Sequence, residues 1–392
     1  MADTIWIKVS SVEIEDLTIK NSANDEFSAG INVIEKKWFD PGEYPCTISN
    51  IQIFNCDIES NDCGIKFSNV RNSNILSCNI FKNLGNSIYF CTANDIKIAD
   101  CEIYDNGEVV EDNSFSGGIY LWWANQQSEN IEISDCKIYD NIGAGIGIDN
   151  VKNVVINQNN IYKNNIGIVI GNNEISNVII DTNTINNNGE GKGFDNGIFI
   201  HDSSNVLIEN NILEENDRAG IYLFRSSTIE IKENSIKNNF YGIRLYSSLS
   251  NLITDNNIKD SSSTGIFMYG FESRNNRIYR NNLIDNFWNA KFSSDNVEED
   301  DCIFLRNYWD NGEEGNYWSD FDEKEEGAFD KNHDGIVDSN YTISDNNTDN
   351  KPKIKPFGKT KEKNENFFFL KNSWIKNIID IFIEIIKNFK IS

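Results

Sequence analysis

A tetrad of glycine, isoleucine, any residue and an apolar residue returns along most of the chain, often every 22–24 residues. Ser87-Ile88 fills the one place where the glycine is missing. A repeat of this length holds one supersecondary unit, which buries its apolar side only by stacking on its neighbours. The 392 residues are therefore expected to form a solenoid rather than two or three globular domains. The tetrad begins at Gly30, Gly64, Gly118, Gly145, Gly167, Gly197, Gly220, Gly242 and Gly265.

Each repeat contains three short segments in which apolar residues alternate, separated by turns rich in Asn, Asp and Gly. Three strands per repeat cannot pair as hairpins in one fixed register, whereas coiling stacks equivalent strands in parallel, about 4.8 Å apart. Parallel crossovers are nearly always right-handed, and the Leu-x-x-Leu-x-Leu spacing of a leucine-rich horseshoe is absent. The sequence thus predicts an all-β fold, a single-stranded, pectate-lyase-like right-handed parallel β-helix of about ten coils over residues 1–300.

The third segment opens with Cys in the first coils and with Asn in the later ones. Stacked buried amides hydrogen-bond from coil to coil, each adding about 1 kcal/mol, and Cys acts there as a small apolar residue. We expect reduced thiols; the alternative is a disulfide from Cys56 to Cys78 or from Cys78 to Cys101, since Cα atoms one coil apart lie within disulfide range. The predicted ladder contains Cys56, Cys78, Cys101, Cys136, Asn159, Asn183, Asn210, Asn234, Asn256 and Asn281.

The chain is strongly acidic, with 61 Asp and Glu against 35 Lys and Arg, a net charge of −26. This charge repels phosphate backbones, so we expect no nucleic-acid partner. We also expect a monomer, and no apolar run reaches the length of a transmembrane helix. The first residues, MADTIWIKVS, lack the features of a signal peptide and resemble the middle of a repeat, which predicts that the natural protein starts further upstream.

Aromatic residues concentrate at the outward positions of the first segment, after each Gly-Ile. At about 4.8 Å per coil they would form a flat stripe on which sugar rings stack, so we predict a site for a polysaccharide or a cell-envelope glycan. Two insertions, Glu108–Gly117 and Gly189–Asn196, would wall this stripe; alternatively, residues 287–318 or the C-terminal tail cover it. The predicted carbohydrate-binding residues are Tyr89, Tyr120, Trp122, Phe199, Tyr222, Phe224, Tyr246, Phe267 and Tyr269.

A parallel β-helix that is an enzyme suggests a polysaccharide lyase, hydrolase or epimerase, which needs a base with clustered carboxylates or a neutralising cation. The best candidates are His201, Asp202, Arg225 and Arg244, with Asp149 two coils earlier. A His-Asp pair at a strand end is more often a plain turn. The Asp-Asp, Gly-His-Gly and Arg-Ile-Lys motifs of polygalacturonases are absent, and a shared fold does not supply their function.

Residues 301–358 are acidic and aromatic and are expected to cap the solenoid. They contain a loop with oxygen ligands at positions 1, 3, 5, 7 and 9, which predicts a Ca²⁺ site. Position 12 is Tyr341 in place of the bidentate Glu of an EF-hand, so the site is expected to be weak, and a solvated acidic turn is the alternative. The predicted ligands are Asp330, Asn332, Asp334, the Ile336 carbonyl and Asp338.

Residues 359–392 are expected to form a third part, a charged linker followed by an amphipathic helix over 367–391. We expect this helix to pack on the solenoid. Plugging of the open end and peripheral contact with a membrane surface are the alternatives, and mixed charge on the polar face disfavours the membrane.

The C-terminal motifs resemble those of one family. Asn307-Tyr308-Trp309 returns as Asn316-Tyr317-Trp318, the Asp-rich loop follows, and Asp349-Asn-Lys-Pro-Lys-Ile-Lys-Pro356 closes the segment. Over residues 1–358 the chain resembles the NosD-like right-handed β-helix proteins, which are common as secreted or surface proteins of archaea. The resemblance implies an extracytoplasmic location, with copper handling for nitrous-oxide reductase in the namesake.

The residues do not support copper as a cofactor. Copper sites use thiolate, thioether or imidazole ligands, yet Met occurs only at positions 1 and 268, His only at 201 and 333, and most Cys are predicted to point inward. Our leading hypothesis is a non-enzymatic secreted or cell-surface protein that binds carbohydrate or serves as a structural module. The alternative is a polysaccharide-active enzyme on the aromatic face, and copper delivery, from family likeness alone, is the third hypothesis.

Overall fold

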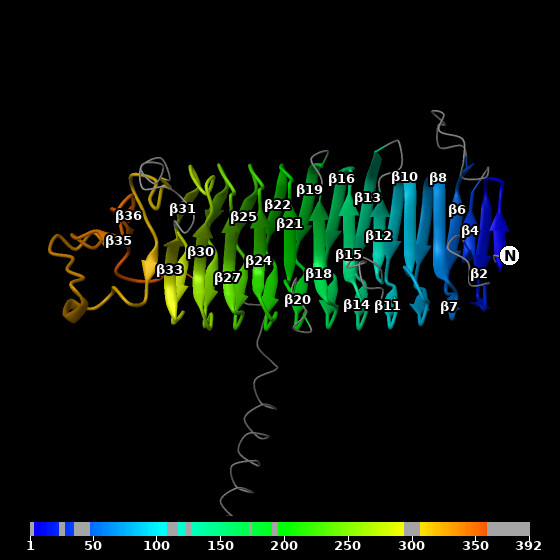
Figure 1. The fold of residues 1–392 in the computed structure, drawn as a ribbon, viewed down its shortest axis with the longest axis horizontal. Helices are drawn as coiled ribbons and strands as arrows, with labels where there is room; N and C mark the ends of the chain where they lie inside the picture. The colour runs from blue at the N-terminus through cyan, green and yellow to red at the C-terminus, as the bar shows by residue number, and fades with distance from the viewer. Residues whose placement is uncertain are drawn as a thin grey trace, which may run out of the picture. The chain divides into compact units, whose positions relative to one another are not determined.

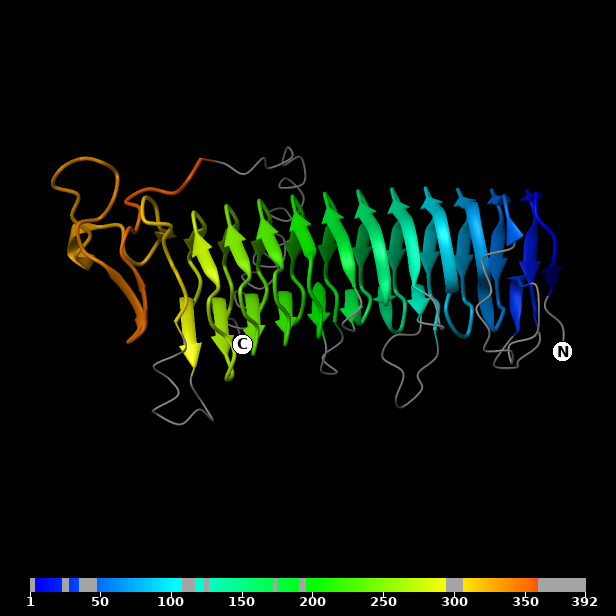
Figure 2. The ribbon, with the colours of Figure 1, turned by 90° about the horizontal axis from the view of Figure 1, so that it is seen from above.

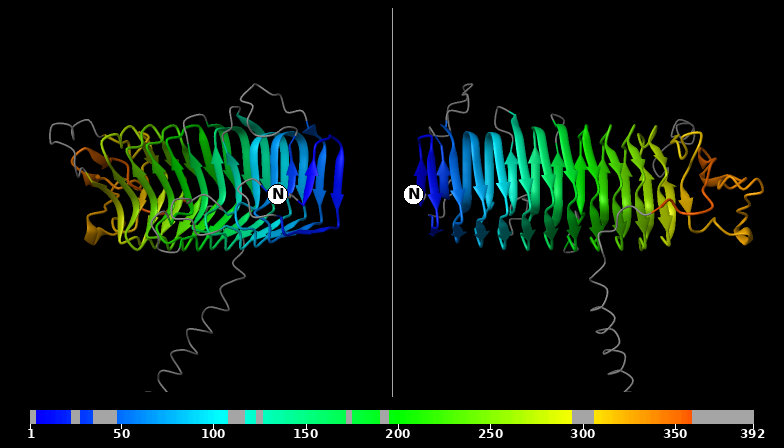
Figure 3. Two further views of the ribbon diagram at one scale, coloured as in Figure 1. Left: turned by 45° about the vertical axis from the view of Figure 1, so that its right-hand side comes forward. Right: turned by 180° about the vertical axis from the view of Figure 1, so that it is seen from behind.

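The computed structural model describes residues 4–22, 28–34, 48–107, 117–122, 127–171, 175–189, 195–293 and 306–358. Met1–Phe357 form one compact unit, a right-handed parallel β-solenoid of about eleven turns with almost no helix (Figure 1). The views from above and from behind show equivalent strands of successive turns side by side (Figures 2 and 3). The predicted C-terminal helix over 367–391 lies outside the described residues.

The Gly-Ile tetrads lie in the first strand of most turns, and these strands pair in parallel with isoleucine opposite isoleucine, as in Ile221, Ile243 and Ile266. The first and last turns lack Gly-Ile, so the tetrad does not reveal them. These strands are β1 (Ile5–Ile7), β4 (Ala29–Val33), β8 (Cys63–Leu76), β10 (Ile88–Ala99), β12 (Ile119–Trp122), β15 (Ala144–Asp149), β18 (Ile166–Gly171), β21 (Ile198–His201), β24 (Ala219–Phe224), β27 (Tyr241–Tyr246), β30 (Thr264–Tyr269) and β33 (Trp288–Ser293).

The second strands join the same 22-stranded sheet, and β8 and β10 run through both positions. The separate strands at this second position are β2 (Val12–Glu15), β5 (Ile48–Ser49), β6 (Ile51–Phe54), β13 (Ser128–Ser134), β16 (Val151–Asn157), β19 (Ser176–Asp181), β22 (Val206–Glu209), β25 (Glu230–Lys232), β28 (Leu252–Thr254) and β31 (Arg277–Tyr279).

The third strands form a 12-stranded parallel sheet of their own. They are β3 (Thr18–Lys20), β7 (Asp57–Glu59), β9 (Asn79–Phe81), β11 (Glu102–Tyr104), β14 (Lys137–Tyr139), β17 (Asn160–Tyr162), β20 (Thr184–Asn186), β23 (Ile212–Glu214), β26 (Ser235–Lys237), β29 (Asn257–Lys259), β32 (Asn282–Ile284) and β34 (Tyr317–Trp318). Beyond them come one 3₁₀ turn, η1 (Lys324–Glu326), and the antiparallel pair β35 (Tyr341–Ser344) and β36 (Asn347–Asp349).

The buried ladder follows the predicted third-strand position with one correction. Asn211, not Asn210, is the rung between Asn183 and Asn234. Asn210 is exposed at a turn with φ of 55°. Every amide Nδ2–H from Asn159 to Asn281 donates to the Oδ1 of the next rung at 2.9–3.0 Å.

The ladder cysteines are free, and each buried thiol donates to backbone carbonyls, as Cys78 does to Leu76. The six cysteines within the described ranges are free of disulfide bonds, as the expectation of reduced thiols has it.

A second ladder of asparagines lies at the turn that precedes the first strand, and sequence analysis did not predict it. Each of its members stands five residues after a rung of the first ladder, as Asn239 does after Asn234. The amides again donate from turn to turn. The second ladder contains Asn61, Asn83, Asn106, Asn141, Asn164, Asn188, Asn216 and Asn239.

The repeated Asn-Tyr-Trp motifs end two ladders at the C-terminal end. Asn316 continues the first ladder, and its backbone N–H donates to the Asp349 carboxylate, where the ladder ends. The same carboxylate accepts the Trp318 indole N–H at 2.9 Å. Asn307 continues a shorter ladder that ends at Asn347. Both Trp309 and Trp318 are fully buried in the same core cluster as the isoleucines. The motifs therefore close the apolar interior rather than form a surface site.

Candidate functional site

The outward positions of the first strands form the two columns that the sequence predicts. One column runs through Tyr89, Tyr120, Gly147, Val169, Phe199, Tyr222, Arg244, Phe267 and Lys291. The second column is made of the residues two positions later in each strand. Cys91 pairs with Trp122, and Asp149 pairs with Gly171. In the later turns the column continues through His201, Phe224, Tyr246, Tyr269 and Ser293. The side chain of Trp122 lies outside what the structure describes.

The rings in the later turns stack on one another. Ring centroids lie 5.2 Å apart for Phe199 and Tyr222 and 5.0 Å apart for Phe224 and Tyr246. Because the rise per turn is about 4.8 Å, rings in adjacent turns cover each other's faces. Phe199 and Tyr222 are each only 7% exposed. The later part of the aromatic stripe comprises Phe199, Tyr222, Phe224, Tyr246, Phe267 and Tyr269. Its rings stack in pairs, as Phe199 does on Tyr222 and Phe224 on Tyr246, and so do not form the continuous flat platform that we expected.

The described part of residues 287–318 does not cover the stripe. β33 continues the first-strand column by one turn, and Trp309 and Trp318 lie in the core. The two insertions expected to wall the stripe fall largely outside the described residues, over 108–116 and 190–194, and so does the C-terminal tail.

Arg244 is enclosed by tyrosines within the stripe. Its guanidinium carbon lies 4.5 Å from the ring centroid of Tyr222, 4.9 Å from that of Tyr269 and 5.4 Å from that of Tyr241. The side chain is 9% exposed and donates to the Tyr269 hydroxyl, while its Nε has no hydrogen-bond partner among the described residues. Burial raises the pKa of the Tyr222 phenol, so this hydroxyl stays protonated beside the cation.

Three of the five candidate catalytic residues converge. Asp202 accepts from Arg225 at 2.8 Å and lies 3.3 Å from the His201 Nδ1. Arg244 instead packs among the tyrosines, and Asp149 lies close enough to Tyr120 to raise the pKa of that phenol, after burial, to about 12. The His201 imidazole lies against Gly171, where even a Cβ would come within 2.2 Å of Nε2. A carboxylate-oriented imidazole of this kind suits a general base.

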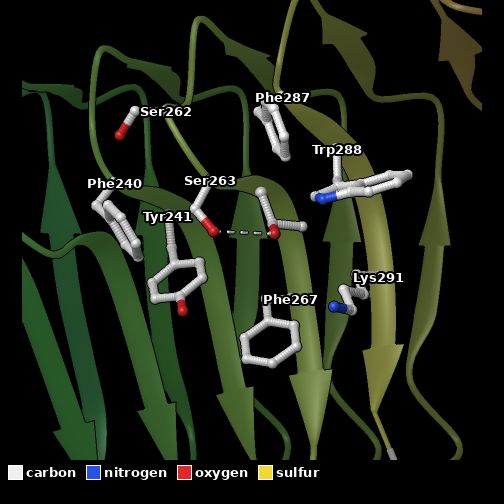
Figure 4. Close-up of a pocket in the computed structure, with 9 residues that line it drawn as sticks. Phe240, Tyr241, Ser262, Ser263, Phe267, Phe287, Trp288 and Lys291 are labelled. Carbon is white, nitrogen blue, oxygen red and sulfur yellow. Dashed lines mark hydrogen bonds between the residues drawn. The ribbon is translucent and has the colours of Figure 1, made fainter.

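A hollow of about 210 Å³ opens beside the stripe, across β27, β30 and β33 (Figure 4). Phe240 and Tyr241 stand on one side and Phe287 and Trp288 on the other, with the Ser263 hydroxyl between them. Phe240 is 44%, Phe287 73% and Trp288 54% exposed. The hollow is lined by Phe240, Tyr241, Ser262, Ser263, Thr264, Phe267, Phe287, Trp288 and Lys291.

The register explains why the hollow exists. Tyr241, Thr264 and Trp288 occupy one position in three successive turns, so the small middle residue leaves a gap between two aromatic walls. The wall backbones stand two turns apart, roughly 9.6 Å. Of the residues that line the hollow, only Phe267 is among the carbohydrate-binding residues predicted from the sequence. The signal was available, because Phe240-Tyr241 and Phe287-Trp288 stand at the same offset in their turns, but the last turn lacks Gly-Ile.

Hydrogen bonds between its own residues hold the acidic loop, residues 330–338, in its conformation. The Asp330 carboxylate accepts from the backbone N–H groups of Asp334 at 3.1 Å and Gly335 at 2.9 Å, and Gly335 has φ of 84°. The N–H of Ile336 donates to Asp334 and holds the pKa of that carboxyl below its ordinary value. Asn332 also accepts from Asp334, and Asp338 accepts from Lys331. Throughout the described ranges, no three His, Cys, Asp or Glu side chains gather as a metal-binding group.

The thioether, imidazole and ladder thiol groups that could bind copper lie in different parts of the fold. Met268 is fully buried in the core, and the ladder thiols point into the solenoid. His201 is on β21, whereas His333 belongs to the acidic loop beyond β34. Met268, the two histidines and the ladder thiols therefore do not form one copper site among the described residues.

Solved structures with the same fold share little sequence with this chain. PfbA, a surface adhesin of Streptococcus pneumoniae, is 14% identical with a TM-score of 0.54, covering 73% of this chain and 80% of the adhesin. The Dettilon tailspike protein is 16% identical with a TM-score of 0.50, covering 73% and 60%. The A-module of the Azotobacter vinelandii mannuronan C-5 epimerase AlgE6 is 15% identical with a TM-score of 0.46, covering 74% and 83%.

No curated protein matches the sequence. None of the helices in the described ranges has the length and apolar character to cross a membrane. The right-handed β-helix region family matches over residues 1–122, 117–283 and 194–377, which together cover nearly all the described turns. The chain is therefore a member of the right-handed β-helix family.

Proposed function

We propose that this protein is a non-enzymatic glycan-binding module. The observation that carries the proposal is the hollow between Phe240 and Tyr241 on one side and Phe287 and Trp288 on the other. These exposed rings stand on a folded β-scaffold, where solvent-facing apolar groups of this size mark binding surfaces.

A sugar unit matches both parts of the hollow. The apolar C–H faces of a pyranose ring pack against the aromatic walls, and its hydroxyls reach the floor of Ser262, Ser263 and Thr264. About 210 Å³ holds one sugar unit rather than a long stretch of polysaccharide. The glycan therefore enters with one unit between the walls, and further units extend over the stripe.

A secreted or cell-surface location fits this proposal. The pneumococcal protein with the same fold is a surface adhesin, which is consistent with a β-solenoid displaying a glycan site outside the cell. The NosD-like resemblance points to the same location.

A glycan array probed with the full chain, followed by mass spectrometry of each bound glycan after prolonged incubation, tests the proposal. We expect binding to a restricted set of glycans and no change in their mass or linkage. Absence of binding to any glycan would contradict the proposal.

The enzyme hypothesis has one specific observation in its favour, the His201–Asp202–Arg225 group on the same outer face. If bound glycans are converted, His201→Ala is expected to abolish conversion while leaving glycan affinity intact, because His201 does not line the hollow. Conversion that survives His201→Ala would exclude this group as the catalytic site.

We also propose that the acidic loop binds Ca²⁺ weakly. The side-chain oxygens of Asp330, Asn332 and Asp334 and the Ile336 carbonyl are hard donors of the type that Ca²⁺ prefers. We expect millimolar Ca²⁺ to raise the melting temperature by a few degrees, and EDTA to reverse the rise. Asp334→Asn should abolish the response. A melting temperature insensitive to both Ca²⁺ and EDTA would rule the site out.

A further inference from the structure

We propose that the glycan bound in the hollow is anionic and carries carboxylate or sulfate groups. This inference rests on the proposed function and adds the chemical class of the ligand. It follows from the charges around the hollow, which differ from those of the rest of the chain.

The outward positions of the first strands in four consecutive turns contain two cations and no carboxylate. Asp and Glu outnumber Lys and Arg by 61 to 35 in the whole chain, so this face is a local exception. The outward residues of β24, β27, β30 and β33 are Ala219, Tyr222, Phe224, Tyr241, Arg244, Tyr246, Thr264, Phe267, Tyr269, Trp288, Lys291 and Ser293.

The two cations on this face have no ion-pair partner among the described residues. Lys232 pairs with Glu209 and Glu230, and Lys237 pairs with Glu214. Neither Arg244 nor Lys291 has such a carboxylate in the described ranges, although Arg244 is nine-tenths buried. A buried cation without a carboxylate partner in the described ranges contributes a positive potential at the surface beside it.

Lys291 places a positive charge in the hollow itself. It lines the hollow at the foot of the Phe287 and Trp288 wall, and it shares a register position with Arg244, two turns away across Phe267. Its ammonium group can reach an anionic substituent of a sugar held between the walls. Arg244 packs against Tyr241, the opposite wall, and adds a second positive charge near the hollow.

A nucleic acid would also offer flat bases to the walls and phosphates to the cations. A net charge of −26 opposes a long polyphosphate chain, whereas a short anionic glycan places few charges in the local positive field. The anionic glycan is therefore the ligand that the observations favour.

Isothermal titration of the full chain at low salt with two matched pairs of oligosaccharides tests this inference. The first pair is an oligouronate and its carboxyl-reduced neutral counterpart, and the second is a sulfated oligosaccharide and its desulfated form. We expect the charged member of at least one pair to bind about tenfold more tightly. The pair that shows the preference identifies the anionic group.

Lys291→Gln is expected to remove most of that preference, because it weakens binding of the charged glycan more than binding of its neutral counterpart. Lys152→Gln, which changes the same charge at an exposed position on another sheet face, should preserve the preference. Equal affinity for charged and neutral glycans would overturn the inference while glycan binding stands. Binding of a single-stranded oligonucleotide with no binding of any glycan would overturn the inference and the proposed function together.

Discussion

Replacing Asn256 with alanine is expected to lower the free energy of unfolding by about 3 kcal/mol. The Asn256 Oδ1 accepts both the backbone N–H and the amide N–H of Asn234. Its own amide donates to the Ile231 carbonyl and to Asn281. The alanine variant therefore leaves donors and acceptors buried without partners in three successive turns, where no water replaces them.

Asn257→Ala is the matched control, because the two asparagines are adjacent on the same turn. The Asn257 side chain points outward from β29 and is partly exposed. We expect this variant to change stability by less than about 0.5 kcal/mol in urea denaturation. Equal losses in the two variants would show that the ladder bonds do not stabilise the fold as described.

The ladder end at Asp349 should make stability fall as pH rises between about 4 and 6. Burial raises the pKa of this carboxyl from 3.8 to about 6, although it accepts N–H groups from Asn316, Trp318 and Lys351. A folded-state pKa above the unfolded value means that the folded protein binds the proton more tightly. The contribution is thus fully present below the unfolded pKa and is lost as pH rises through the folded pKa. Its size is on the order of 3 kcal/mol.

Other carboxyls titrate in the same range, so the informative quantity is the difference between wild type and Asp349→Asn, measured by denaturation from pH 4 to pH 7. The asparagine does not titrate, and we expect wild-type stability to fall relative to the variant as pH rises. Parallel pH curves would contradict a raised pKa at Asp349. Substitution of Gly315 is not a suitable control, because a Cβ there would lie 1.8 Å from the Asp349 Oδ1.

The repeat predicted the fold because each turn repeats the same physical requirement. An apolar pair alternates inward in every strand, so the positions of Ile221, Ile243 and Ile266 follow from the sequence alone. The choice between Asn210 and Asn211 did not follow from it. Both are followed two residues later by an apolar residue, and only the left-handed backbone at Asn210 places Asn211 in the ladder.

The site was less predictable than the scaffold because it depends on differences between neighbouring turns. The alternation after each Gly-Ile predicted which rings face outward. It did not predict that rings one turn apart would stack face to face, as Phe199 and Tyr222 do. The hollow results from a small residue, Thr264, between Tyr241 and Trp288. A search for aromatic residues alone finds the walls of such a hollow and misses the gap that makes it a site.

The most direct test of glycan binding in the hollow is the dissociation constant of the tightest glycan from the array, measured for Trp288→Ala and for Phe271→Ala. Both residues are exposed, at 54% and 56%, and Phe271 does not line the hollow. Loss of one aromatic wall should weaken binding about 30-fold, or about 2 kcal/mol, while Phe271→Ala leaves it unchanged. Unchanged affinity in Trp288→Ala, or equal losses in the two variants, would contradict a site between these walls.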